Sequence, residues 1–244
     1  MVRTANKGGM NRSAFLAATA TLAAAANTPA PAAQVPGGTH YVERAADFDR
    51  AAFDAALGRS AQIRQLWEAV AFKPPIWNSV KNSMNGLQFG YGYPAGSFVM
   101  AFAAHGPSSA YGYDDDVWRK YRIAEFLGLR DADGSVPASN GYVARRAPID
   151  PAADPDDPAG MYQDASIGML QRRGLMYLAC HTAIEEQARG IVKKGFAPAG
   201  VSARDVADDM LTHLIPGAVV VPSMVATVAV LQASYKYTYI TIAM

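Results

Sequence analysis

Cysteine is scarce in this sequence, and its scarcity limits the chemistry that the chain can carry. Cys180 is the only cysteine among 244 residues. A single thiol excludes an internal disulfide framework, and it excludes any zinc site that needs two or more thiolates. We therefore expect Cys180 to be an unpaired thiol.

An excess of charge of one sign is also missing. The chain has 22 Lys+Arg and 21 Asp+Glu, which gives a formal net charge of +1 at pH 7. Binding to nucleic acid through its phosphates requires a concentrated excess of Lys and Arg. We therefore expect no nucleic-acid partner.

The motifs of several large ligand-binding and enzyme classes are absent. The sequence has no GxGxxG, no P-loop and no GxSxG elbow. The sequence thus gives no indication of a dinucleotide-binding protein, a nucleotide-binding protein or an α/β-hydrolase, and we expect no cofactor. The apolar run over 218–231 is interrupted by Pro222 and is shorter than the roughly 20 residues that cross a bilayer, so we expect no membrane span in the mature chain.

Acidic residues are absent from the first 33 positions, which instead carry three basic residues ahead of an apolar run. That run covers residues 15–26, and small residues follow at the Ala30-x-Ala32 spacing. This order is typical of a secretory signal peptide. The sequence therefore predicts export to the periplasm or to the cell exterior after cleavage.

The domain prediction follows from this leader and from the composition of the body. We predict a signal peptide over 1–33, a tether over 34–46 and a folded domain over 47–244. Residues 130–160 are rich in Asp and Pro and show no apolar periodicity. Such a long irregular segment is unusual in a compact domain, and we interpret it as an oligomer arm or a mobile loop in preference to a lid.

Apolar periodicity predicts the regular elements. Helices are expected over 47–57 with Asp47 as its cap, 63–70, 76–87, 117–127, 182–195, 202–214 and 225–231. Strands are expected over 97–104, 174–179, 218–221 and 235–242. From residue 97 onward strands and helices alternate, which predicts a three-layer α/β domain with a mainly parallel sheet of four or five strands.

Polar residues of interest follow the predicted strands. His105, the pair Cys180-His181 and the pair Pro222-Ser223 each come after one strand. Ligands of open parallel sheets bind beyond the carboxyl ends of the strands, so Cys180, His181 and His105 are our candidate catalytic residues. A helix N-terminus and a protonated His181 would both lower the pKa of the Cys180 thiol. The alternative is that Cys180 only fills space in the core.

Two other features have simpler interpretations. The three consecutive aspartates over 114–116 precede an apolar helical stripe, and we interpret them as the start of a helix and not as a calcium loop. His213 lies near a helix end, where its ring can meet the last carbonyls, and we predict a structural role for it.

Three segments together resemble the DsrE-like sulfur-relay superfamily, including its exported members of unassigned role. They are Leu178-Ala179-Cys180 with the helix that follows, residues 213–222 ahead of a Tyr-rich strand, and residues 103–107 ahead of an Asp/Trp helix. The resemblance covers roughly residues 97–242. It implies a flavodoxin-like domain that forms homo-oligomers, with a cysteine at the position of Cys180 that carries sulfur as a persulfide.

Three functional hypotheses follow. In the first, an exported DsrE-like protein handles sulfane sulfur, or another thiol-reactive small molecule, through Cys180. In the second, the protein is a non-catalytic oligomeric binding or scaffold protein in which Cys180 is structural. In the third, His105, Cys180 and His181 meet as nitrogen and sulfur ligands of a copper or zinc ion.

Overall fold

A computed structural model describes residues 42–46 and 48–241 of the chain. These residues belong to one compact unit, Gly37–Met244. The predicted signal peptide, most of the predicted tether and the predicted cap Asp47 lie outside the described residues. Among the residues that the structure describes, no helix is both long and apolar enough to cross a bilayer.

Strands and helices alternate along most of the domain. The strands are β1 Ile63–Ala69, β2 Phe98–Ala104, β3 Leu175–Cys180, β4 Val219–Val221 and β5 Thr238–Thr241. The helices are α2 Arg50–Leu57, α3 Ile76–Asn85, η1 Gly86–Gly90, η2 Gly106–Gly112, α4 Asp115–Lys120, α5 Ile123–Leu127, α6 Ile167–Arg172, α7 His181–Lys193, α8 Ala203–Thr212 and α9 Met224–Tyr235.

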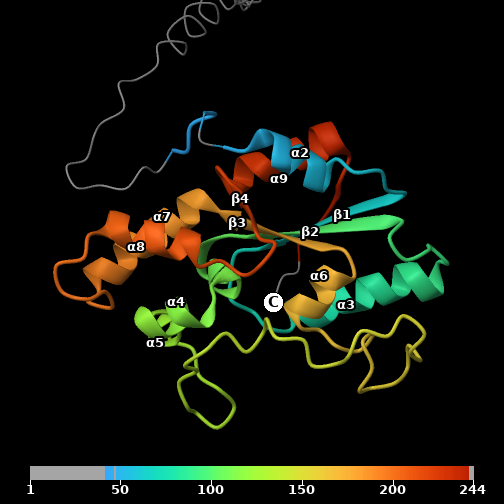
Figure 1. Cartoon of the computed structure of the whole chain (residues 1–244), viewed down its shortest axis with the longest axis horizontal. Helices are drawn as coiled ribbons and strands as arrows, with labels where there is room; N and C mark the ends of the chain where they lie inside the picture. The colour runs from blue at the N-terminus through green and yellow to red at the C-terminus, as the bar shows by residue number, and fades with distance from the viewer. Residues whose placement is uncertain (1–41, 47, 242–244) are drawn as a thin grey trace, which may run out of the picture. The chain divides into compact units, whose positions relative to one another are not determined.

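The five strands form one sheet in the order β4-β3-β2-β1-β5, and all neighbouring strands are parallel. Helices α2 and α9 cover one face of this sheet, and α3, α4 and α6 lie on the other (Figure 1). This arrangement confirms the predicted three-layer, flavodoxin-like α/β fold.

The central strand β2 explains why the fold could be anticipated. All seven of its residues are buried, because helices cover both of its faces. Alternate side chains enter the two cores, with Phe102 and Met100 on the α3 side and Ala101 and Val99 on the α9 side. A continuous apolar run of this kind is what a parallel strand in the middle of a three-layer domain requires.

The prediction of a helix over 63–70 is wrong, because this segment is strand β1. It pairs with β2 on one side and with β5 on the other. Its side chains alternate between the cores, with Leu66 toward α9 and Trp67 toward α3. The apolar residues at helical spacing are too few to outweigh the pairing with two neighbouring strands.

Two other predicted helices begin or end differently in the structure. The N-cap of α2 is Asp49, whose side chain accepts a hydrogen bond from the backbone N–H of Ala52 at 2.8 Å. The single helix expected over 117–127 is divided into α4 and α5, because Arg122 between them has a left-handed backbone with φ of 47°. The side-chain stripe survives this break, since both short helices still pack on the same core.

The irregular segment over 130–160, yellow in Figure 1, contains turns and no strand or helix. It is nevertheless attached to the domain by buried polar contacts. The Asn140 amide donates to the carbonyl oxygens of Tyr111 at 2.9 Å and Tyr113 at 2.7 Å. Just beyond the segment, the backbone N–H of Gly168 donates to the carbonyl of Val143 at 3.0 Å. These contacts attach the segment to η2 and α6.

Candidate functional site

The carboxyl ends of β2, β3 and β4 lie side by side at one edge of the sheet. Ala104 pairs with Ala179, and Cys180 pairs with Val221. The residues predicted to follow these strands, His105, Cys180 and Pro222, therefore gather along this edge. The structure confirms their placement, and their chemical role remains a prediction.

Cys180 lies where the direction of the chain through the sheet reverses. The chain passes from β1 through β2 and β3 to β4, and the helices that follow β3 pack on the α3 side of the sheet. It then returns to β5 through α9, which packs on the opposite face. Adjacent strands whose connections leave toward opposite faces mark the usual ligand crevice of an open α/β sheet. Here these strands are β3 and β4.

The sulfur of Cys180 is held by the first turns of two helices. As the N-cap of α7, its Sγ accepts from the backbone N–H of Ala183 at 3.4 Å. It also accepts from the backbone N–H of Met224, the first residue of α9, at 3.3 Å. The Thr182 hydroxyl donates to the carbonyl of Pro222 at 3.0 Å and joins the two loops. Two backbone donors from separate elements thus converge on one sulfur atom.

Burial controls the protonation of this thiol. Cys180 is only 4% exposed and packs among apolar residues beneath α9. Burial raises the pKa of the Cys180 thiol, and the hydrogen bonds from Ala183 and Met224 lower it by less. The lowered pKa expected from the sequence is therefore wrong, because removal from water outweighs the helix N-terminus.

His181 begins α7, directly after Cys180. Its Nε2 lies 3.8 Å from Oε1 of Glu185, one turn further along the helix, and both side chains are largely buried. The ring is therefore placed beside a carboxylate of its own helix. Sequence analysis identified the histidine but not this acidic neighbour.

His105 belongs to a polar cluster on the β1 side of the same edge. Its Nε2 lies 3.0 Å from Oε1 of Glu68, and the Tyr239 hydroxyl donates to the other carboxylate oxygen. The side chains of His105 and Glu68 are 18% and 17% exposed, so both reach solvent. We refer to Glu68, His105 and Tyr239 as the imidazole cluster.

Sequence analysis missed Glu68 because it assigned strand β1 to a helix. One signal was available in the sequence, since Glu68 is the only charged residue in the apolar stretch over 66–72. A single acid in such a stretch indicates a residue whose charge has a specific partner.

The three candidate residues do not form a metal site, which corrects the third hypothesis. The ligand atoms of His105, Cys180 and His181 do not come close enough together to share an ion. In the structure His105 contacts Glu68, the Cys180 sulfur accepts from two backbone N–H groups, and His181 lies beside Glu185. Within the described part of the chain, Asp114, Asp116 and His213 form a metal-sized group, which means that one ligand atom of each lies close enough to the others to share an ion. These three atoms are all within 4.8 Å of one another.

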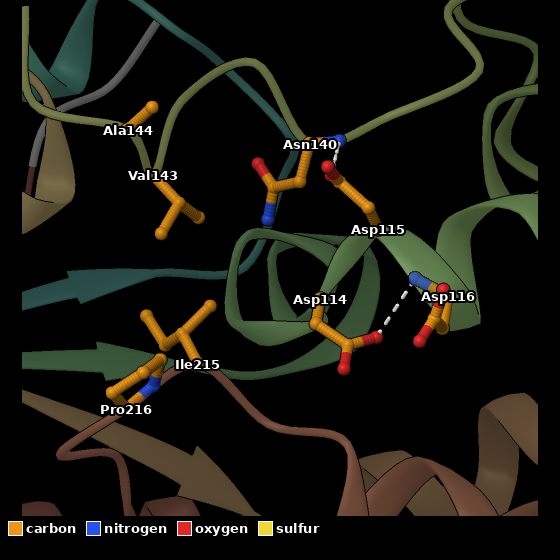
Figure 2. Close-up of a pocket in the computed structure, with 8 residues that line it drawn as sticks. All are labelled: Asp114, Asp115, Asp116, Asn140, Val143, Ala144, Ile215 and Pro216. Carbon is orange, nitrogen blue, oxygen red and sulfur yellow. Dashed lines mark hydrogen bonds between the residues drawn. The ribbon is translucent and has the colours of Figure 1, made fainter.

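That group adjoins an acidic pocket of about 350 Å³. Figure 2 shows the three aspartates together on the first turn of α4, opposite a more apolar wall. The lining residues are Asp114, Asp115, Asp116, Asn140, Val143, Ala144, Ile215 and Pro216. A pocket of this charge would favour a cation over an anion.

Each member of the metal-sized group already has a structural contact. Asp114 caps α4 by accepting from the backbone N–H of Asp116 and Val117 at 3.0 Å, which confirms the predicted helix start. Asp116 pairs with Arg119. The Nδ1 of His213 lies 2.9 Å from the carbonyl of Asp209, which confirms its predicted contact with the end of a helix. That contact and the nearby aspartates raise the pKa of His213.

Comparison of the chain with family models, with curated proteins and with solved structures finds no match. The resemblance to the DsrE-like superfamily therefore stays a prediction made from the residues themselves. The functional argument has to be built from the geometry of the carboxyl edge.

Proposed function

We propose that the protein accepts sulfane sulfur on Cys180 and holds it as a persulfide. The observation that carries this proposal is the convergence of two backbone N–H groups, from Ala183 and Met224, on a sulfur at the carboxyl ends of β3 and β4. Backbone donors at helix N-termini stabilise negative charge. They would serve the thiolate that attacks and the persulfide anion that results. We place this activity in an exported compartment because of the leader pattern over residues 1–33.

The proposed reaction is a transfer between thiols and needs no oxidant or reductant. Cys180 loses its proton, and its thiolate attacks the outer sulfur of a small persulfide, R–S–SH. The new Sγ–S bond forms as the donor S–S bond breaks. The donor leaves as the thiol R–SH after taking up a proton, and Cys180 carries the transferred sulfur as Cys–S–SH.

Deprotonation is the demanding step, because burial raises the pKa of Cys180. His105 directly follows β2 and Cys180 ends β3, and the residues before them, Ala104 and Ala179, are register partners. Glu68 fixes the orientation of the His105 ring. We assign to His105 the role of accepting the thiol proton, and to Glu68 the role of positioning it.

A second function is favoured by a different observation. Cys180 is 4% exposed and the pKa of its thiol is raised, which suits an unreactive core residue. In that case the protein is a non-catalytic binding protein, and the thiol is part of its packing. The two proposals differ in whether the folded protein takes up sulfur.

The test is the intact mass of the folded protein after incubation with glutathione persulfide. The proposal predicts a gain of one sulfur atom that a thiol reductant reverses. Since Cys180 is the only cysteine, a persulfide on the chain can only be carried there. Cys180→Ser should abolish the gain, and His105→Gln should slow it at neutral pH with less effect at high pH, where hydroxide replaces the base.

Two controls make the result decisive. His213→Gln removes an imidazole that takes no part in the carboxyl edge, and it should leave the rate of sulfur uptake unchanged. Uptake that occurs only in denaturant, or that is equally fast in the His105 variant at every pH, would contradict the proposed roles. The first of these outcomes would establish Cys180 as structural.

A further inference from the structure

A second cavity, of about 260 Å³, lies on the α3 side of the sheet and has no part in the proposed sulfur chemistry. The loop after β1, the first turn of α3, the irregular segment and the residues before α6 form its walls. The lining residues are Pro74, Pro75, Trp77, Asn78, Tyr142, Arg146, Ala165 and Ser166. No carboxylate lines it, in contrast to the acidic pocket beside α4.

The one charged group that lines this cavity is cationic. Arg146 has an exposed side chain, and no carboxylate of the described residues lies within ion-pair distance of its guanidinium. Tyr142 and Asn78 add a hydroxyl and an amide. The Ser166 hydroxyl accepts from the backbone N–H of Met169 at 3.3 Å, and its side chain is also hydrogen-bonded to the Asp164 carboxylate. The lining is thus rich in hydrogen-bond donors.

A buried donor on the cavity wall is also without an acceptor. Trp77 is 3% exposed, and its indole N–H has no hydrogen-bond partner in the described structure. Leaving a buried donor unsatisfied is unfavourable, and native proteins seldom do so. The indole nitrogen is itself buried, so Trp77 contributes its ring, and not this N–H, to the lining of the cavity.

The aromatic wall is rigid. The ring of Tyr142 packs edge-on against Tyr111 at 5.3 Å and against Phe72 at 5.6 Å. Trp77 is held between Phe102 at 4.2 Å and Tyr111 at 5.0 Å. Rings fixed in this way bind a planar group without the entropic cost of ordering the wall.

One buried carboxylate positions Arg146 and Ser166 together. Asp164 accepts from the backbone N–H of Arg146 at 2.7 Å, of Ala147 at 2.9 Å and of Ser166 at 2.8 Å. Its charge is thus engaged by backbone donors, and Asp164 itself does not line the cavity. This arrangement fixes the backbone at Arg146, whose side chain lines the cavity.

We propose that this cavity binds a small aromatic carboxylate. The carboxylate would pair with Arg146, whose planar fork suits two parallel hydrogen bonds to such a group. The aromatic body would lie against Trp77 and Tyr142. The loop after β1 lies at the carboxyl edge of the sheet, where parallel α/β domains bind ligands, although on the face opposite to Cys180.

The test is calorimetric titration of the full-length protein with benzoate. The proposal predicts saturable binding that Arg146→Gln weakens at least about tenfold, because the charged pair is lost. Arg145→Gln is the matched control, since it removes the same charge from the neighbouring exposed residue, which does not line the cavity. It should change the affinity by less than about twofold.

Two further probes separate the parts of the proposal. Benzamide, which has the ring without the charge, should bind at least about tenfold more weakly than benzoate. Inorganic phosphate, which has charge without a ring, should not compete with benzoate. Thermal unfolding of each variant checks that it is folded. Absence of saturable benzoate binding, equal affinity in the Arg146 variant, or competition by phosphate at similar concentration would each overturn the proposal.

Discussion

The carboxyl edge of the sheet has two polar sites, Cys180 and the imidazole cluster, and their hydrogen-bond partners are of different kinds. At Cys180 the partners are backbone N–H groups of Ala183 and Met224, and the sulfur is almost sealed from solvent. In the imidazole cluster the partners are the side chains of Glu68 and Tyr239, and water reaches them.

The difference shows how each environment is encoded. The surroundings of Cys180 are set by the fold, because the first turns of α7 and α9 supply the donors whatever their side chains are. The imidazole cluster depends on the identity of three residues from three strands or strand ends. Substitutions should therefore disrupt the imidazole cluster more easily than they disrupt the donors around Cys180.

The largest expected effect concerns the accessibility of the thiol. At neutral pH the folded protein should react with iodoacetamide at least about tenfold more slowly than the chain in urea, since both burial and the raised pKa of Cys180 suppress the thiolate. The ordinary pKa of a cysteine thiol is 9.0, and the pKa of Cys180 is raised in the folded protein. Its contribution to the free energy of unfolding is therefore fully present below pH 9.0 and is lost as the pH rises through the folded-state pKa. Labelling followed by mass spectrometry should therefore accelerate above pH 9. Equal rates with and without urea would refute the sealed environment.

The next effect compares two replacements of Cys180. Cys180→Ala removes the acceptor for two backbone N–H groups and leaves a small void, which should lower the free energy of unfolding by about 2 kcal/mol. Cys180→Ser keeps an acceptor at the helix N-cap and should cost about 1 kcal/mol or less. Urea unfolding measures both. Equal losses would show that the backbone donors contribute little.

The smallest effects concern the imidazole cluster. Glu68→Ala deprives both His105 and Tyr239 of their acceptor and should cost about 1 to 2 kcal/mol, because the site is partly hydrated. Tyr239→Phe removes one hydrogen bond and should cost less than about 1 kcal/mol. Tyr91→Phe, at an exposed tyrosine, is the control and should stay within about 0.5 kcal/mol of the parent in urea unfolding. A Glu68 variant as stable as the control would show that the cluster is not coupled to folding.

Much of the fold could be predicted because its inner strands are continuous apolar runs. β2 and β3 are buried on both faces, and such runs ending at Gly or His are recognisable without any structure. β1 could not be recognised in the same way. It mixes Arg64, Gln65 and Glu68 with apolar residues. The side chains of Gln65 and Glu68 find partners, Ser83 and His105, that only the assembled fold supplies.

The candidate site was predictable in position and not in chemistry. The strand ends placed His105 and Cys180 at one edge, since parallel strands share a direction. Three features depend on contacts that sequence spacing does not contain: the burial of the thiol, the donor from Met224 and the pairing of His105 with Glu68. Each joins segments more than thirty residues apart or depends on how the helices pack.

The position of β5 beside β1 has a consequence for how the chain assembles. Among the described strands β1 is synthesised first, yet one of its edges stays unpaired until residues 238–241 arrive. That edge is thus open while residues 70–237 are synthesised, and open edges invite pairing with other chains. Pairing of β5 with β1 completes the sheet that the structure describes. The Tyr239 hydroxyl of β5 contacts Glu68, so the imidazole cluster is completed only when this pairing has taken place.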